Sequence, residues 1–295
     1  MVDLHGVLSA VVTPFTADGE EIDEAALRAV VEFTVRAGIH GLIPCGSTGE
    51  FATLSLDERR RVMEVVADQA AGRTPVVPQV GAMTTRDAVL LARHAESHGA
   101  AAVMAVSPYY EALTLAEIGD YYRRLAASVS IPVMVYNLPA ATGVNLPPAE
   151  VARLARDVPT IRYIKDTTGD LSQAAQLIHD HADVVSTFVG WDPLFFAALM
   201  EGAAGSVLGA GNIVPGQTAE IYEHVRAGRI TEARERWAQL YPLMRFLVSV
   251  PYTPAVKTGV SLLGHAGAAS RHPVAPLEPD RAAELEALLK GVGAL

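Results

Sequence analysis

The feature that most constrains this chain is a regular alternation of short apolar segments with longer amphipathic segments. The short segments are continuous apolar runs, as expected for strands that are buried on both faces of a parallel sheet. In the longer segments apolar residues recur at helical spacing, which predicts helices. Eight strand–helix units follow one another, with predicted strands at residues 7–13, 41–45, 75–80, 101–107, 132–136, 161–165, 184–189 and 205–208.

Eight successive strand–helix units predict a (β/α)8 barrel, an α/β fold that typically needs about 250 residues. A doubly wound parallel sheet is the alternative architecture. After Gly228 the strand-like runs stop, and three more helices are predicted at residues 230–248, 254–263 and 280–289. We therefore expect a barrel over residues 1–228, with a helical region over residues 229–295 that packs directly on it.

Several predicted helices carry recognisable start signals. Asp23 is positioned to cap the first helix. Ser55 and Glu58 have the spacing of a capping box, in which each side chain bonds a free backbone N–H of the first turn. Thr84 or Thr85 is positioned to cap the third helix. These signals support the helical interpretation of the longer segments.

Composition excludes several classes of function. A net charge of −10 argues against nucleic acid and anionic membrane surfaces as partners, because both require basic patches. Cys45 is the only cysteine, which excludes disulfides within the chain and cysteine-based zinc sites. No apolar run approaches the roughly 18 residues of a membrane span, and residues 1–7 do not resemble a signal peptide. We expect a cytoplasmic protein without a metal or a cofactor.

One lysine stands out by its position. The chain has only three lysines against twenty arginines, and Lys165 follows the predicted strand that contains Ile161, Tyr163 and Ile164. Arginine stays protonated in proteins, whereas a partly desolvated lysine can lose its proton and attack a carbonyl. Lys165 is therefore a candidate for forming a Schiff base with a 2-oxo acid. The alternative is a structural lysine whose stem is buried and whose amine reaches water.

Other polar residues are predicted to lie at the same rim, because the active sites of such barrels lie at the carboxyl ends of the strands. Strand two runs into Gly46-Ser47-Thr48-Gly49-Glu50, whose backbone N–H groups and hydroxyls could hold a carboxylate. Tyr136 ends the strand before Lys165, where its phenol could transfer a proton. An ordinary tight turn and a core tyrosine are the respective structural alternatives.

Three further groups favour ordinary structural roles. Tyr109 and Tyr110 follow a proline and are typical of packing or of an interface. His94 and His98 are four residues apart on a predicted outer helix, which favours a solvated face over a metal site. Lys257 is the rival amine, but it belongs to the helical tail, where no strand end would bring it to the rim.

Taken together, these motifs resemble the dihydrodipicolinate synthase/N-acetylneuraminate lyase family, the class I pyruvate-dependent aldolases. The resemblance covers nearly the whole chain. It is specific because short motifs occur in the right order at successive predicted strand ends, namely Val12-Thr13-Pro14-Phe15, Gly46-Ser47-Thr48-Gly49-Glu50, Pro108-Tyr109-Tyr110, Tyr136-Asn137-Leu138-Pro139, Thr142-Gly143 and Ile164-Lys165-Asp166.

The resemblance implies a (β/α)8 barrel with a C-terminal three-helix extension, which is usually a homotetramer built as a dimer of dimers. It implies that Lys165 is the Schiff-base lysine and that Tyr136 is the general acid and base. Ser47 would pass protons on from Tyr136. Tyr110, which such enzymes often contribute across a subunit interface, would extend this relay to solvent.

The resemblance also implies how the substrate is held. Ser47 and Thr48, with the Gly46 turn, would bind the carboxylate of pyruvate or another 2-oxo acid. Val207 matches a position whose backbone carbonyl lies near the bound pyruvate. Thr167 and Asp192 would be partners for substrate hydroxyls.

Two departures from the family pattern bear on the substrate. Dihydrodipicolinate synthases typically carry an arginine, which holds a substrate carboxylate, where this chain has Ala141. Sialate lyases tend to have Gly-Tyr-Asp-Glu after the seventh strand, where this chain has Gly190-Trp191-Asp192-Pro193. The expected function is therefore a lyase or aldolase acting on pyruvate and a 2-oxo-3-deoxy or 4-hydroxy-2-oxo acid.

Three other functions remain open on the sequence. A 4-hydroxy-tetrahydrodipicolinate synthase would need a different carboxylate anchor in place of Ala141. A dehydratase of a sugar-derived 2-oxo acid would use the same lysine. A non-catalytic 2-oxo acid binder is the alternative outside enzymes, but such a protein needs no proton relay of Tyr136 and Ser47.

Overall fold

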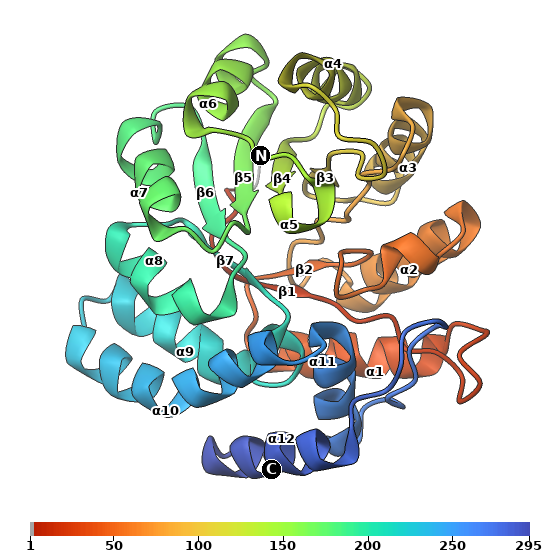
Figure 1. Ribbon diagram of the computed structural model, residues 1–295, viewed down its shortest axis with the longest axis vertical. Helices are drawn as coiled ribbons and strands as arrows, with labels where there is room; N and C mark the ends of the chain where they lie inside the picture. The colour runs from red at the N-terminus through yellow and green to blue at the C-terminus, as the bar shows by residue number, and fades with distance from the viewer. Residues whose placement is uncertain (1–2) are drawn as a thin grey trace.

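The computed structural model describes residues 3–295 and contains a parallel sheet enclosed by helices (Figure 1). Within these residues seven strands are hydrogen-bonded in the order β2-β1-β7-β6-β5-β4-β3. All of their pairings are parallel, so the carboxyl ends of the strands meet at one end of the barrel. The strands are β1 (Gly6–Ala10), β2 (Gly41–Ile43), β3 (Val103–Val106), β4 (Val133–Asn137), β5 (Ile161–Asp166), β6 (Ser186–Val189) and β7 (Gly205–Leu208).

Residues 75–80 close the barrel between β2 and β3 without forming a regular strand. Val77 donates a hydrogen bond to β2, and the Pro78 carbonyl accepts one of 2.9 Å from Met104 of β3. Pro75 and Pro78 have no backbone N–H, so a continuous ladder cannot form here. The prediction of a regular third strand was therefore wrong, although the segment takes the place of a strand and the (β/α)8 architecture is confirmed.

The helices around the sheet begin where the sequence signals predicted. Asp23 accepts a hydrogen bond from Ala26 N–H, the capping box of Ser55 and Glu58 is formed, and Thr84 caps α3. The short α5 was not predicted. The barrel helices are α1 (Glu24–Arg36), α2 (Leu56–Ala70), α3 (Thr85–Ser97), α4 (Leu115–Ala126), α5 (Pro139–Thr142), α6 (Pro148–Asp157), α7 (Leu171–Asp180), α8 (Phe195–Glu201) and α9 (Pro215–Arg226).

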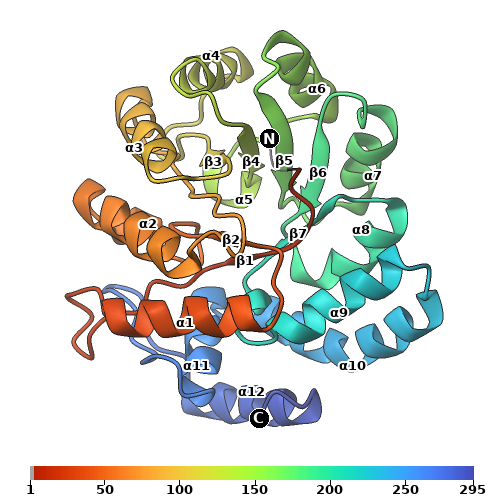
Figure 2. The same cartoon turned by 180° about the vertical axis from the view of Figure 1, so that it is seen from behind.

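The C-terminal region consists of α10 (Ile230–Ser249), α11 (Tyr252–Leu262) and α12 (Pro279–Gly291). Helix α10 contacts α9 and the 3-10 turn Asp192–Leu194 that follows β6, and α11 contacts the turn Ala210–Asn212 that follows β7. Figures 1 and 2 show α12 at the outer edge, beyond α11. Among residues 3–295, none of the helices has both the length and the apolar character needed to cross a bilayer.

The inside of the barrel is filled by side chains from alternate strand positions, as the two-residue period of a strand requires. This inner cluster is separate from the larger core between the sheet and its helices. It therefore forms a solid floor beneath the end of the barrel where the strands finish. Its buried members are Leu4, Leu8, Ala10, Ile43, Val77, Ala102, Met104, Val106, Met134, Tyr136, Tyr163, Phe188 and Val207.

Candidate active site

Lys165 lies inside the barrel near the carboxyl end of β5. Tyr163, two residues earlier on the strand, packs in the inner cluster, so Lys165 projects inward as well. Its side chain is buried, and Nζ lies 4.1 Å from the ring centroid of Tyr136. No carboxylate of residues 3–295 forms an ion pair with this amine. Burial of an amine without a paired charge is costly, which favours a chemical role for Lys165 over a structural one.

Tyr136 faces the lysine from the neighbouring strand. The two residues are register partners in the pairing of β4 with β5. The Tyr136 hydroxyl lies 3.4 Å from Ser47 Oγ, at the long end of hydrogen-bond distances. Ser47 comes from the loop after β2, so three separate strand ends bring an amine, a phenol and an alcohol together.

A cavity of about 230 Å³ lies above these groups. Most of the predicted site residues line it, and its lining contains no arginine. Residues that the sequence analysis did not single out also contribute to the wall, among them Ala10, Leu138, Gly209, Val248, Tyr252 and Thr253. The predicted residues that line it are Ser47, Thr48, Tyr136, Lys165, Thr167, Asp192 and Val207.

The loop that carries Ser47 and Thr48 is held against the end of β1. Thr13 donates a hydrogen bond of 2.8 Å to the Gly49 carbonyl. A β-carbon at Gly49 would lie 2.9 Å from the carbonyl oxygen of Val11, so a larger residue would push the loop away. The loop is thus a tight turn, which was the structural alternative predicted from the sequence. It also forms a wall of the cavity.

Gly190 makes room for the Lys165 side chain. A β-carbon at this position would lie 2.6 Å from Cε of Lys165 and 2.1 Å from Oγ1 of Thr167. A β-carbon does not come within 3.0 Å of another heavy atom in real structures, so any other residue would displace both groups. The glycine after β6 is therefore part of what positions the lysine.

Thr167 has a hydroxyl with unused hydrogen-bonding capacity. Its Oγ1 is buried, and within residues 3–295 it forms no hydrogen bond. Because Thr167 also lines the cavity, this hydroxyl is available to a hydroxyl or carbonyl group of a bound molecule.

Asp192 lines the cavity, but its carboxylate is already engaged. Oδ2 accepts a hydrogen bond of 2.7 Å from the Tyr252 hydroxyl, and Oδ1 accepts one of 3.2 Å from Ala210 N–H. Burial raises the pKa of Asp192, and these hydrogen bonds partly offset that effect. Tyr252 begins α11, and no sequence signal marked it, because its approach to the barrel depends on how the C-terminal helices pack.

Two predicted site residues lie apart from this group. The Tyr110 side chain is 84% exposed and forms no hydrogen bond to Tyr136 or Ser47 within the described chain. Gly46 is buried but does not line the cavity. Any part of Tyr110 in a proton relay therefore requires a second subunit, and the role of Gly46 stays a prediction.

Lys257, the rival amine, lies closer to the rim than the sequence indicated. It is buried and forms an ion pair with Glu50, the last residue of the loop that carries Ser47. Its Nζ also donates a hydrogen bond of 2.8 Å to the Ala269 carbonyl. The expectation that it stays away from the rim was wrong, but its amine is paired and does not line the cavity.

Comparison with known proteins identifies the family of the chain. Residues 3–292 match the Dihydrodipicolinate synthetase family. The chain is 35% identical to the 4-hydroxy-tetrahydrodipicolinate synthase of Methanopyrus kandleri, over 99% of this chain and 97% of that protein. It is 38% identical to the enzyme of the same name from Methanothrix thermoacetophila, over 97% of this chain and 96% of that one.

Solved structures give the same result. The prophage protein YagE from E. coli K12, a family member in complex with pyruvate, superposes with a TM-score of 0.94 at 30% identity and covers 99% of both chains. The dihydrodipicolinate synthase of Acinetobacter baumannii, also complexed with pyruvate, gives a TM-score of 0.95 at 30% identity, over 99% of this chain and all of that one.

The chain is a class I lyase, a member of an enzyme class that works through a Schiff base. More specifically, the chain belongs to the Dihydrodipicolinate synthetase family.

Proposed function

We propose that the chain forms a Schiff base between Lys165 and pyruvate and reversibly joins the resulting enamine to an aldehyde without a carboxylate at its far end. The products would be 4-hydroxy-2-oxo acids or 2-oxo-3-deoxy acids. The observation that carries the proposal is the buried Lys165 amine, which forms no ion pair with a carboxylate of residues 3–295 and faces a cavity beside Tyr136. Two related proteins have been crystallised with pyruvate, which supports the choice of 2-oxo acid.

The chemistry follows from these groups. Neutral Nζ attacks C2 of pyruvate, and loss of one water gives an imine. The imine accepts the electron pair left when a proton leaves C3, and the enamine then attacks the aldehyde carbon. The Tyr136 hydroxyl, 3.4 Å from Ser47 Oγ, can deliver a proton to the new alkoxide. Water finally hydrolyses the product imine and restores the amine.

The substrate carboxylate is assigned to the loop after β2. Ser47 and Thr48 line the cavity with hydroxyls, and the backbone N–H groups of the same loop add donors. Val207 of β7 also lines the cavity, and its carbonyl would lie near the bound 2-oxo acid. No metal is needed for these steps, because the imine itself is the electron sink.

The far end of the substrate is proposed to be neutral. The cavity lining has no arginine, and Ala141 lines an adjoining apolar cavity where the resemblance would place a guanidinium. The free Thr167 hydroxyl supports a partner hydroxyl on the substrate. Asp192 contributes less than the sequence predicted, because Tyr252 and Ala210 already engage its carboxylate.

A second candidate is 4-hydroxy-tetrahydrodipicolinate synthase, which condenses pyruvate with aspartate semialdehyde. Relatives with 35% and 38% identity carry that name, and this favours it. It would require an anchor for the second carboxylate other than position 141.

The two candidates predict opposite aldehyde preferences. With pyruvate, we expect the wild-type chain to have a higher kcat/KM for glyceraldehyde than for aspartate semialdehyde. In Ala141→Arg we expect this ratio to shift by about 10- to 100-fold toward aspartate semialdehyde, because a guanidinium–carboxylate hydrogen bond contributes about 1.5–3 kcal/mol. The measurement is initial rates, with each product identified by mass.

Ala140→Arg is the matched control, since it adds the same charge one residue away and should leave the ratio unchanged. A wild-type preference for aspartate semialdehyde would favour the second candidate and reject the neutral far end. If pyruvate gives no condensation product with any aldehyde, both candidate functions are rejected.

We also propose that the chain forms a homotetramer built as a dimer of dimers. The exposed Tyr110 supports this, because the relay predicted for it cannot form within one chain. Sedimentation equilibrium of the 31.2 kDa chain is expected to give four times that mass. A monomer that is fully active would contradict both the assembly and the role of Tyr110.

A further inference from the structure

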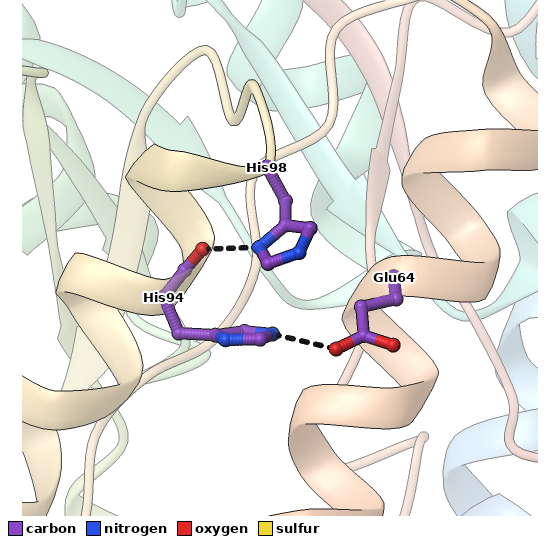
Figure 3. Close-up of side chains that lie close together, drawn as sticks. All are labelled: Glu64, His94 and His98. Atoms are coloured by element: carbon purple, nitrogen blue, oxygen red, sulfur yellow. Dashed lines mark hydrogen bonds and ion pairs between the residues drawn. The ribbon is translucent and has the colours of Figure 1, made fainter.

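Two histidines and a glutamate meet on the outer ring of the barrel, away from the catalytic cavity. His94 and His98 lie one turn apart on α3, and Glu64 faces them from α2 (Figure 3). The two imidazole centroids are 4.2 Å apart. One potential ligand atom from each of the three residues lies within 4.8 Å of the others. The sequence predicted only a solvated histidine pair, because nothing in it paired Glu64 with α3.

The His94 ring has an unsatisfied nitrogen. Its Nε2 is buried and forms no hydrogen bond of acceptable geometry within residues 3–295, although it lies 3.2 Å from Oε1 of Glu64. A buried polar atom of this kind normally has a partner, so this nitrogen can take a ligand.

His98 is oriented as metal-binding histidines are. Its Nδ1 lies 2.8 Å from the carbonyl oxygen of His94, and a carbonyl can only accept, so Nδ1 carries the proton. Nε2 is then left with a free lone pair. Metal-bound histidines typically donate their other N–H to a carbonyl or carboxylate in this way.

Glu64 is also held in place by a partner outside the cluster. Its Oε2 accepts a hydrogen bond of 3.2 Å from Arg61, which leaves Oε1 directed at His94. Because one carboxylate oxygen is already held and the other faces the imidazoles, the Glu64 side chain would lose little further conformational freedom on binding an ion.

We propose that Glu64, His94 and His98 form a binding site for a divalent transition-metal ion of the zinc type. Two imidazole nitrogens and one carboxylate oxygen suit Zn²⁺, Cu²⁺ or Ni²⁺, whereas Mg²⁺ and Ca²⁺ require oxygen ligands. Ligands at about 2.0–2.1 Å from a tetrahedral ion lie about 3.3 Å apart, so the side chains need only a small inward movement. The fourth position is open to water, and the ion would join α2 to α3.

Isothermal titration of the untagged chain with ZnCl2 tests the site. We expect one Zn²⁺ per chain and at least about 10-fold weaker binding in His98→Gln and in His94→Gln. MgCl2 should give no saturable binding. Zn²⁺ should also raise Tm by at least about 2 °C in the wild type but not in His98→Gln, because only the folded chain holds the three ligands together.

His179→Gln is the matched control. His179 pairs with Glu201 at 3.0 Å on the surface, and within residues 3–295 these two belong to no group of three potential metal ligands, so its loss should leave zinc binding unchanged. Because the His98 side chain is exposed, His98→Gln should retain the fold and the lyase activity. The proposal is overturned if the wild type shows no saturable binding up to about 1 mM, or if His98→Gln binds zinc as tightly as the wild type.

Discussion

Replacing Lys165 with alanine is expected to abolish covalent labelling by pyruvate and borohydride and to lower kcat by at least about 10⁴-fold. Borohydride reduces an imine to a stable amine, so labelling reports the Schiff base directly. Within residues 3–295 the amine forms no ion pair, so its removal breaks no buried ion pair and should leave the fold intact. The measurements are intact mass after trapping, the steady-state rate and the circular dichroism spectrum.

Lys290→Ala is the matched control for this experiment. Lys290 is exposed and pairs only with Glu286, so its loss should change neither labelling nor rate. Labelling that persists in Lys165→Ala would assign the Schiff base to another amine, of which Lys257 is the buried candidate. A wild-type chain that turns over substrate without being trapped would falsify the Schiff-base mechanism.

The sequence could predict the strand-end part of the site because neighbouring parallel strands end at the same rim. Tyr136 and Lys165 are consecutive strand ends, and the register of β4 with β5 makes them neighbours. The Ser47 loop was assigned to the same rim by the same reasoning. Tyr252 could not be predicted this way, since it reaches the cavity from a helix whose packing no local pattern determines.

In the fold, too, local sequence patterns were easier to predict from than features that depend on long-range pairing. Capping signals such as Ser55 with Glu58 act over one turn and were confirmed. The segment at residues 75–80 has the composition of a strand, but its prolines remove donors that a ladder needs.

The division into residues 1–228 and 229–295 stays a prediction. Residues of the second part contact the loop of the first part that carries Ser47.

The loop that carries Ser47 and Thr48 rests on a buried ion pair from the C-terminal region. Glu50 ends the loop in a left-handed conformation with φ of 55°. Its carboxylate pairs with Lys257 and accepts a hydrogen bond of 3.1 Å from the backbone N–H of Arg271. Burial lowers the pKa of Lys257, and the charge of Glu50 partly offsets this. Removing either partner would therefore leave a buried charge without its counterpart.

Lys257→Met is expected to lower the free energy of unfolding by about 3–5 kcal/mol, because the Glu50 carboxylate would stay buried without its counter-charge. The loop should loosen as well, which would raise KM for pyruvate more than it lowers kcat. Urea titration and steady-state kinetics measure the two effects. Lys290→Met, which removes an exposed pair, should change stability by no more than about 0.5 kcal/mol.

The double variant Lys257→Met/Glu50→Gln separates the ion pair from simple packing. Glutamine removes the stranded charge and keeps an oxygen for Arg271 N–H, so it should recover at least half of the lost stability. If the double variant is no more stable than Lys257→Met, the loss comes from other contacts of the lysine side chain, such as that of its amine over the Phe15 ring, 4.2 Å from Nζ to the centroid. Recovery of stability together with the low KM would show that the damage in Lys257→Met comes from the unpaired Glu50 charge, which Lys257 of the C-terminal region neutralises in the wild type.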